Sequence, residues 1–205
     1  SRRKLHLEPN GKASLTIPLC FGRFQGEARD LLAGVTAKIA KGWTADEATA
    51  RVQNTLRKAP PLAAKYRGQE KYERLYAHAI TTLSSLCIQG EGGYTGKKCV
   101  PYTTKYSLAI AFFWDTAFSA VGLREFDPAL AQEAIQCFAE NAGPRGALPG
   151  TLCDSHRGGE GQAPIMAWAS WLVYQRSRDK DWLRRIYPAL AGNNRFWFKY
   201  HASPR

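Results

Sequence analysis

The chain has 205 residues, of which 44% are hydrophobic and 12% are aromatic. This composition is sufficient for a packed core and excludes a globally disordered chain. The formal net charge of +12 raises the possibility of a nucleic-acid-binding protein. However, basic residues alternate with acidic ones between positions 46 and 74, and no DNA- or RNA-binding motif accompanies them. Such scattered charges are typical of a solvated helical surface.

Residues 1–25 have the pattern of short β-strands. Apolar residues alternate with polar ones on both sides of a Pro9-Asn10-Gly11 turn. Because two strands are only marginally stable alone, we expect this segment to be the end of a β domain that begins earlier.

Residues 26–66 are expected to form a helical linker. One helix is predicted over residues 27–40. Another is predicted from Thr44, which has the spacing of a capping box with Glu47. The Pro60-Pro61 pair then ends the helical pattern.

Residues 67–205 are predicted to form the main domain. A long helix from about residue 69 to residue 87 carries an apolar stripe that includes Ile80. A glycine-rich loop over residues 88–106 follows. Part of this loop resembles a phosphate-binding loop, but it lacks the first glycine and the final Ser or Thr of that motif. We therefore reject a phosphate site here.

The predicted helices after residue 107 alternate between two types. Apolar helices are predicted over residues 108–123 and 164–174, and amphipathic ones begin at Asp127-Pro128 and Asp179, with Pro188 separating a last helix that ends near His201. Helices that are apolar on all sides are usually buried, and amphipathic ones lie outside them. The alternation predicts a mainly α fold of concentric helical layers, as in an (α/α)6 barrel of six helical hairpins. A full ring needs about 12 helices and more than roughly 200 residues, so only about half a ring is expected.

The apolar segment 111–120 contains one carboxylate, Asp115. An ionised carboxylate in such a segment is costly unless something compensates its charge. Asp115 could be the N-cap of a helix that starts at Thr116. Alternatively, it could face a cleft and bind sugar hydroxyls while Trp114 packs against a sugar ring. The two roles are compatible, and the sequence leaves both open.

A second candidate segment is the Gly/Pro-rich loop over residues 143–161, which leads into the helix predicted from Pro164. Its end carries Arg157, Glu160 and Gln162, all able to hydrogen-bond to hydroxyl groups. Loops on a rigid scaffold commonly carry binding groups. The alternative is a solvent-exposed loop with Gln162 close to the helix N-terminus.

Four short motifs occur in order along the chain: Phe113-Trp114-Asp115-Thr116-Ala117-Phe118, Gly122-Leu123, Gly146-x-Leu148-Pro149 and Gly161-Gln162-x-Pro164. With helices between them, they resemble the family 63 glycosidases and their trehalase-like relatives, which include bacterial α-glucosidases and mannosylglycerate hydrolases. The resemblance covers about residues 106–201. It implies the N-terminal half of a six-hairpin (α/α) barrel, preceded in residues 1–25 by the remnant of a β-sandwich.

The resemblance also implies a function for individual residues. Trp114, Asp115 and Gln162 resemble the family's sugar-binding residues, and we add Phe113 and Arg157 as candidate substrate contacts. The family inverts the anomeric carbon with a carboxylic acid and a carboxylate about 6.5–9.5 Å apart. Neither catalytic group has a counterpart in these 205 residues. One departure is small, because the usual Gln-Pro-Pro is Gln-Ala-Pro here.

These observations predict a fragment or subunit of an inverting α-glycosidase that acts on an oligosaccharide or a small glycoside. Its partner is expected to be a complementary chain or the missing C-terminal half of the barrel. No metal or cofactor is expected, and no membrane span, because the most apolar run is shorter than roughly 20 residues. The alternatives are a non-catalytic carbohydrate-binding or regulatory protein of the same fold and, supported by charge alone, a basic helical nucleic-acid-binding protein.

The five cysteines show no zinc-binding spacing with the four histidines. Cys137 lies on an apolar helix face, which favours a buried free thiol. Cys87 and Cys99 flank the glycine-rich loop and could pair in an oxidising compartment. The sequence leaves their redox state open.

Overall fold

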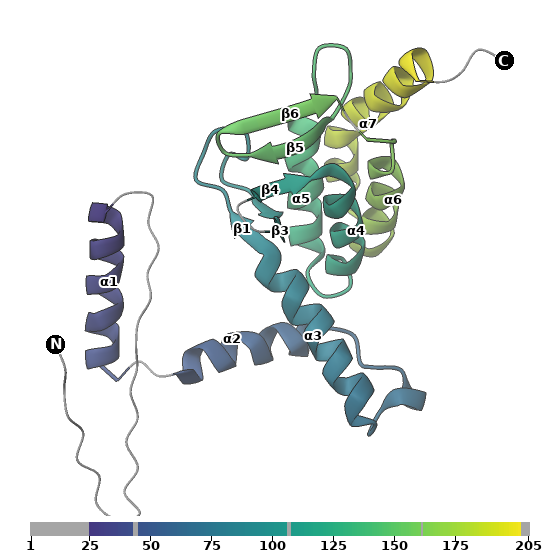
Figure 1. Ribbon diagram of the computed structural model, residues 1–205. Coiled ribbons are helices and arrows are strands. Elements are labelled where there is room, and N and C mark those ends of the chain that lie inside the picture. Colours follow the sequence, from purple (N-terminus) through teal and green to yellow (C-terminus); the bar gives the residue numbers. More distant parts are fainter. Residues whose placement is uncertain (1–24, 43–44, 106–107, 161, 202–205) are drawn as a thin grey trace, which may run out of the picture. The chain divides into compact units, whose positions relative to one another are not determined.

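The computed structural model describes residues 25–42, 45–105, 108–160 and 162–201 (Figure 1). The chain divides into two compact units, residues 1–51 and residues 52–205. In the first unit, helix α1 (Gln25–Ala40) confirms the helix predicted over residues 27–40. The predicted strands before residue 25 and the predicted capping box of Thr44 lie outside the described residues.

The helices on either side of the Pro60-Pro61 pair follow local sequence signals. Helix α2 (Ala45–Lys58) ends just before the two prolines, and the short 3₁₀ helix η1 (Ala64–Tyr66) follows them. Helix α3 (Glu70–Leu86) has the predicted length. Its Ile80 is buried, whereas Leu75 on the same predicted stripe is exposed.

Two small antiparallel sheets interrupt the helices. Strands β1 (Cys87–Gln89) and β2 (Cys99–Pro101) pair with each other. The second sheet has the order β3-β4-β5-β6 and contains the strands Thr103–Lys105, Leu108–Phe112, Pro149–Cys153 and His156–Glu160. The prediction of plain loops over residues 88–106 and 143–161 was therefore wrong. These strands are short, β5 and β6 contain glycine, and the pairing of β4 with β5 joins segments that are distant in the sequence, which local patterns do not show.

The apolar run 108–123 is not one helix. It begins as strand β4, whose Ala111 and Phe112 pair with Leu152 and Thr151 of β5, and continues as helix α4 (Phe113–Leu123). Periodicity alone cannot distinguish a buried strand from a buried helix in a continuous apolar run. Pairing with β5 makes residues 108–112 a strand.

The remaining helices pack against one another, with one of them behind the second sheet and the others beside it in Figure 1. Helix α5 (Pro128–Glu140) begins as predicted, with the Asp127 Oδ1 accepting a hydrogen bond of 3.1 Å from the backbone nitrogen of Leu130. It packs against α4, α6 (Met166–Ser177) and α7 (Lys180–Tyr200). The residues that it buries include Ile135, Cys137 and Phe138.

Pro188 does not divide the last helix, contrary to the prediction. Helix α7 runs from Lys180 to Tyr200 with Pro188 inside it. A proline removes one backbone hydrogen bond and usually kinks or breaks a helix. Here Ile186 before it and Leu190 after it are both buried in the core, so packing on each side keeps the helix continuous.

The unit 52–205 is mainly helical, with one hydrophobic core between the second sheet and helices α3 to α7. The largest fully buried side chains of this core include Phe113, Phe138 and Trp182. Among the described residues, none of the helices has the length and apolar character that crossing a membrane would require.

The loop between β1 and β2 is held in place by Asp154, in the turn between β5 and β6. The Asp154 carboxylate accepts hydrogen bonds from the Glu91 backbone nitrogen (2.9 Å) and from the buried Thr95 hydroxyl. The Asp154 backbone oxygen accepts one from the Tyr94 nitrogen (3.0 Å). The loop is thus bonded to a strand turn about 60 residues further along the chain.

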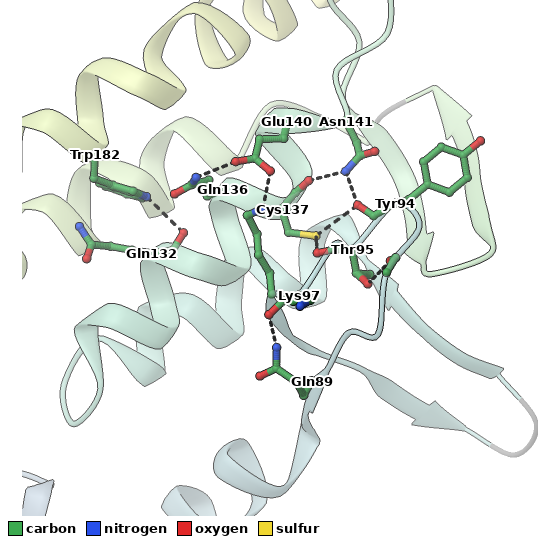
Figure 2. Close-up of polar contacts among 12 residues, drawn as sticks. Gln89, Tyr94, Thr95, Lys97, Gln132, Gln136, Cys137, Glu140, Asn141 and Trp182 are labelled. Atoms are coloured by element: carbon green, nitrogen blue, oxygen red, sulfur yellow. Dashed lines mark hydrogen bonds and ion pairs between the residues drawn. The ribbon is translucent and has the colours of Figure 1, made fainter. Parts of the chain in front are cut away.

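Residues at the C-terminal end of helix α5 also hold this loop (Figure 2). The Asn141 side-chain amide donates a hydrogen bond of 2.7 Å to the Tyr94 carbonyl oxygen, and the Lys98 ammonium lies 2.5 Å from the Glu140 carboxylate. Burial alone would raise the pKa of Glu140, but hydrogen bonds from Lys98 and Gln136 outweigh burial and lower this pKa.

The lowered pKa of Glu140 predicts a pH-dependent stability contribution. A group whose pKa is depressed in the folded state stabilises the fold above its unfolded-state pKa and loses this contribution as the pH falls through the folded value. Because the Glu140 side chain is about half exposed, Glu140→Gln should cost only up to about 1 kcal/mol at pH 7. We expect the difference in free energy of unfolding between the two proteins to shrink as the pH falls below the usual range of a glutamate.

Urea unfolding at pH values from 7 down to 3 measures this difference. The control is Lys98→Met in both backgrounds. If the ion pair is responsible, the cost of Glu140→Gln should largely disappear once Lys98 has been replaced. An effect of Glu140→Gln that is the same at pH 7 and pH 3 would contradict the prediction.

Candidate functional site

Trp114 and Gln162 meet at the start of helix α4. The Trp114 backbone nitrogen donates a hydrogen bond of 2.9 Å to the Gln162 Oε1, and its indole Nε1 donates one of 3.2 Å to the Ala163 carbonyl oxygen. The first backbone N–H groups of a helix have no partner within the helix, so Gln162 satisfies one of these groups in α4. Gln162 therefore fixes the position of the tryptophan as well as reaching the surface beside it.

Asp115 is not the N-cap of a helix that starts at Thr116. Helix α4 begins at Phe113, so Asp115 lies in its first turn. Its side chain is exposed and makes no hydrogen bond or ion pair with any described residue. A carboxylate is favourable at this end of a helix because of the helix dipole, and exposure removes the cost expected for a buried charge. The carboxylate of Asp115 is thus accessible to a ligand.

Phe113 and Arg157 both contact other parts of the fold. Phe113 is fully buried, with its ring edge-on to Phe138 at a centroid distance of 5.9 Å. Arg157 lies in β6, and its Nε donates a hydrogen bond of 2.8 Å to the Asn141 carbonyl oxygen at the end of α5. Because Phe113 is fully buried, we leave it out of the proposed site. Arg157 is half-buried, and its contact with a substrate stays a prediction.

Sequence reasoning missed a strip of exposed aromatic side chains beside Trp114. We call it the aromatic surface, and it consists of Trp114, Phe118, Trp168 and Trp171, each between 43% and 55% exposed. Phe118 of α4 contacts Trp168 of α6 edge to face, with ring centroids 6.1 Å apart. The signal in the sequence was spacing, because residues 114 and 118, like 168 and 171, share one side of a helix. Both helices were instead expected to be buried on all sides.

A shallow pocket of about 230 Å³ lies near the end of α7 and is lined by Pro164, Asn194, Trp197, Phe198 and His201. Pro164 follows Gln162 by two residues, so this pocket adjoins the segment that holds Trp114. The indole Nε1 of Trp197 is buried without a hydrogen-bond partner among the described residues. Aromatic faces combined with a few polar groups are typical of small-molecule pockets.

Within the described part of the chain, no three His, Cys, Asp or Glu side chains are arranged to hold a metal ion. The surface around Trp114 combines the accessible Asp115 carboxylate, aromatic ring faces and side-chain amides. Such groups bind hydroxyl-bearing rings by hydrogen bonds and by apolar contact.

Comparison with known proteins relates residues 110–205 to a protein family. Residues 110–205 match the model of the mannosylglycerate hydrolase MGH1-like glycoside hydrolase domain. The crystal structure of an uncharacterized conserved protein from Thermus thermophilus is similar at 22% sequence identity and a TM-score of 0.44. This similarity covers 58% of the present chain and 32% of the Thermus protein. The comparison with curated proteins found no match. The domain match supports a glycosidase-like family and a glycosidase-related function for residues 110–205.

Proposed function

We propose that this chain supplies the sugar-binding part of an inverting α-glycosidase, while the catalytic acid and base lie outside these 205 residues. The observation that carries the proposal is the exposed Asp115 carboxylate next to Trp114, whose backbone and indole nitrogen are both fixed by residues 162–163. The match to a mannosylglycerate hydrolase-like domain over residues 110–205 supports it. The substrates are α-glucosides or related α-glycosides.

In this proposal Asp115 holds the sugar without taking part in bond cleavage. Its carboxylate accepts hydrogen bonds from sugar hydroxyls, and the Trp114 ring packs against the apolar face of the sugar. Inverting hydrolysis needs a protonated carboxyl at the leaving oxygen and a carboxylate that activates water from the opposite side. Asp115 would fix the sugar between these two groups. Productive positioning of this kind contributes to the rate as well as to affinity.

We further propose that the described helices are about half of an (α/α)6 barrel of the family 63 and trehalase-like type. The aromatic surface supports this, because its four large side chains are about half exposed. Contiguous exposed apolar patches commonly mark interaction sites. In the proposal, the remaining helical hairpins, supplied by the same polypeptide or by a complementary chain, cover part of this surface and bring the two catalytic carboxyl groups toward Asp115.

Asp115→Asn tests the proposed role in the protein that also carries the catalytic carboxyl groups. The change removes the charge from hydrogen bonds to sugar hydroxyls, which are worth roughly 1.5–3 kcal/mol each. We expect kcat/KM for an α-glycoside to fall by about 10- to 150-fold. The melting temperature should barely change, because the side chain is exposed and makes no bond with the described residues. Steady-state kinetics and thermal melting of the two proteins measure both quantities.

Asp179→Asn is the matched control, because Asp179 also lies at a helix start. Its Oδ1 accepts a hydrogen bond of 2.8 Å from the Trp182 nitrogen, and asparagine caps helices about as well as aspartate. This variant should keep both its activity and its stability. If Asp115→Asn has kinetics as unchanged as those of Asp179→Asn, Asp115 does not bind the substrate and the proposed site is wrong.

A further inference from the structure

The two strands of the β1–β2 ribbon place Cys87 and Cys99 on the same face. Cys87 is paired with Pro101, and Cys99 is paired with Gln89. Residues two apart in a strand share a face, so the two cysteines occupy diagonal positions across the ribbon. Both side chains are half-buried, and the two thiols lie close enough to shift each other's pKa. The Cys87 Sγ also donates a hydrogen bond of 3.3 Å to the Leu83 carbonyl oxygen.

The proximity of the two thiols makes a direct bond between the two sulfur atoms geometrically accessible. Diagonal positions in an antiparallel ribbon are normally about 7–8 Å apart, slightly longer than a disulfide spans. Two-stranded ribbons twist strongly, which shortens one of the two diagonals. Both thiols are free, and each is the largest influence on the pKa of the other, as is expected of neighbouring sulfur atoms. A small approach of the two strands is therefore enough for oxidation.

The interaction between the two thiols makes them chemically different. A hydrogen bond between them is the main cause that lowers the pKa of Cys99 and raises the pKa of Cys87. The thiolate is the attacking species in thiol chemistry, so Cys99 is the better nucleophile of the two. Cys137 differs from both, because burial raises the pKa of its thiol to about 12.

We propose that Cys87 and Cys99 are a redox-active dithiol that is oxidised to an intramolecular disulfide by exchange with a small disulfide such as oxidised glutathione. The Cys99 thiolate attacks one glutathione sulfur, forming a mixed disulfide and releasing one glutathione thiolate. Cys87 then loses its proton and attacks the Cys99 sulfur, which releases the second glutathione. Two thiols of the protein are oxidised and one glutathione disulfide is reduced to two glutathione molecules.

The disulfide would close the loop that Asp154 and Asn141 already hold. A cross-link around a loop of about 13 residues restricts the unfolded chain and should raise the melting temperature by about 6–12 °C. The bond would also tie the C-terminal end of α3 to β2, because Cys87 is the C-cap residue of α3. The redox state of the dithiol would thus control how firmly this end of α3 is attached to the fold.

The test uses the purified chain in glutathione buffers of increasing oxidised fraction, quenched with an alkylating reagent. Peptide mapping by mass spectrometry should show a Cys87–Cys99 bridge in the wild type, together with the rise in melting temperature. Cys87→Ser should instead accumulate one glutathione on Cys99, because the second step is blocked. Cys99→Ser should take up much less glutathione on Cys87. The double variant should show no rise in melting temperature on oxidation.

The wild-type mapping decides the proposal even if a variant folds poorly. A wild-type protein that stops at the mixed disulfide would overturn it, as would a bridge from either residue to Cys20, Cys137 or Cys153. Equal glutathione uptake by the two single variants would contradict the assignment of Cys99 as the attacking thiol. None of these outcomes depends on whether the chain binds sugars.

Discussion

Trp182→Ala is expected to lower the free energy of unfolding by about 3–5 kcal/mol, the usual cost of removing a large aromatic side chain from a core. Trp182 is 1% exposed, and its Nε1 donates a hydrogen bond of 3.2 Å to the Gln132 carbonyl oxygen (Figure 2). Alanine would leave a cavity between α5 and α7 and would remove this hydrogen bond. Domains are stable by only about 5–15 kcal/mol, so this loss is a large fraction of the total.

Trp171→Ala provides the matched comparison, because this tryptophan is 53% exposed on the aromatic surface. Its removal should change the free energy of unfolding by roughly 0.5 kcal/mol or less, as is usual for surface positions. Urea unfolding followed by circular dichroism measures both variants. Similar losses in the two would show that Trp182 is not the core residue described here, or that Trp171 is covered in solution.

Gly93→Ala should be nearly as damaging, with an expected loss of about 3–5 kcal/mol. Gly93 has φ of 55°, where residues other than glycine cost roughly 1–2 kcal/mol. A Cβ at this position would also overlap the Asp154 backbone oxygen. Relieving the overlap costs typically 1–3 kcal/mol, and it would displace the oxygen that accepts the Tyr94 hydrogen bond.

Gly96→Ala separates the cost of the steric overlap from the cost of the left-handed backbone conformation. Gly96 has a similar φ of 61°, but the nearest atom to a Cβ there is the flexible Lys98 ammonium nitrogen, at 3.8 Å. This variant should lose only about 1–2 kcal/mol, the cost of the left-handed conformation. Chemical denaturation of both variants checks the difference. If Gly93→Ala were no less stable than Gly96→Ala, the contact with Asp154 would contribute little.

The parts of the fold that could be predicted are those marked by individual residues in the local sequence, such as prolines and helix caps. The proline pair at 60–61 and the Asp127-Pro128 start of α5 act through residues adjacent in the sequence, and both predictions were confirmed. The strand β4 was missed because an apolar run fits a strand and a helix equally well. The continuity of α7 through Pro188 depends on core packing, which no local pattern contains.

The candidate site was predictable only in part, for a related reason. The order of the motifs predicted that Trp114, Asp115 and Gln162 belong to one site. In the structure, a hydrogen bond joins Trp114 to Gln162, 48 residues further along the chain. The role of Gln162 at the start of α4 rather than α6 could not be deduced, because it depends on how two distant segments pack. The same holds for Phe113, whose burial depends on its contact with Phe138 on α5.

The hydrogen bonds of Asp154 affect local unfolding and amide hydrogen exchange. Its carboxylate and its backbone oxygen accept bonds from the amides of Glu91 and Tyr94, so these amides cannot exchange their hydrogens while the turn between β5 and β6 is intact. The glycine-rich loop and the β5–β6 hairpin therefore belong to one cooperative unit of local unfolding. The glycine-rich loop, whose composition suggests independent motion, should therefore be protected from hydrogen exchange to the same degree as the β5–β6 hairpin.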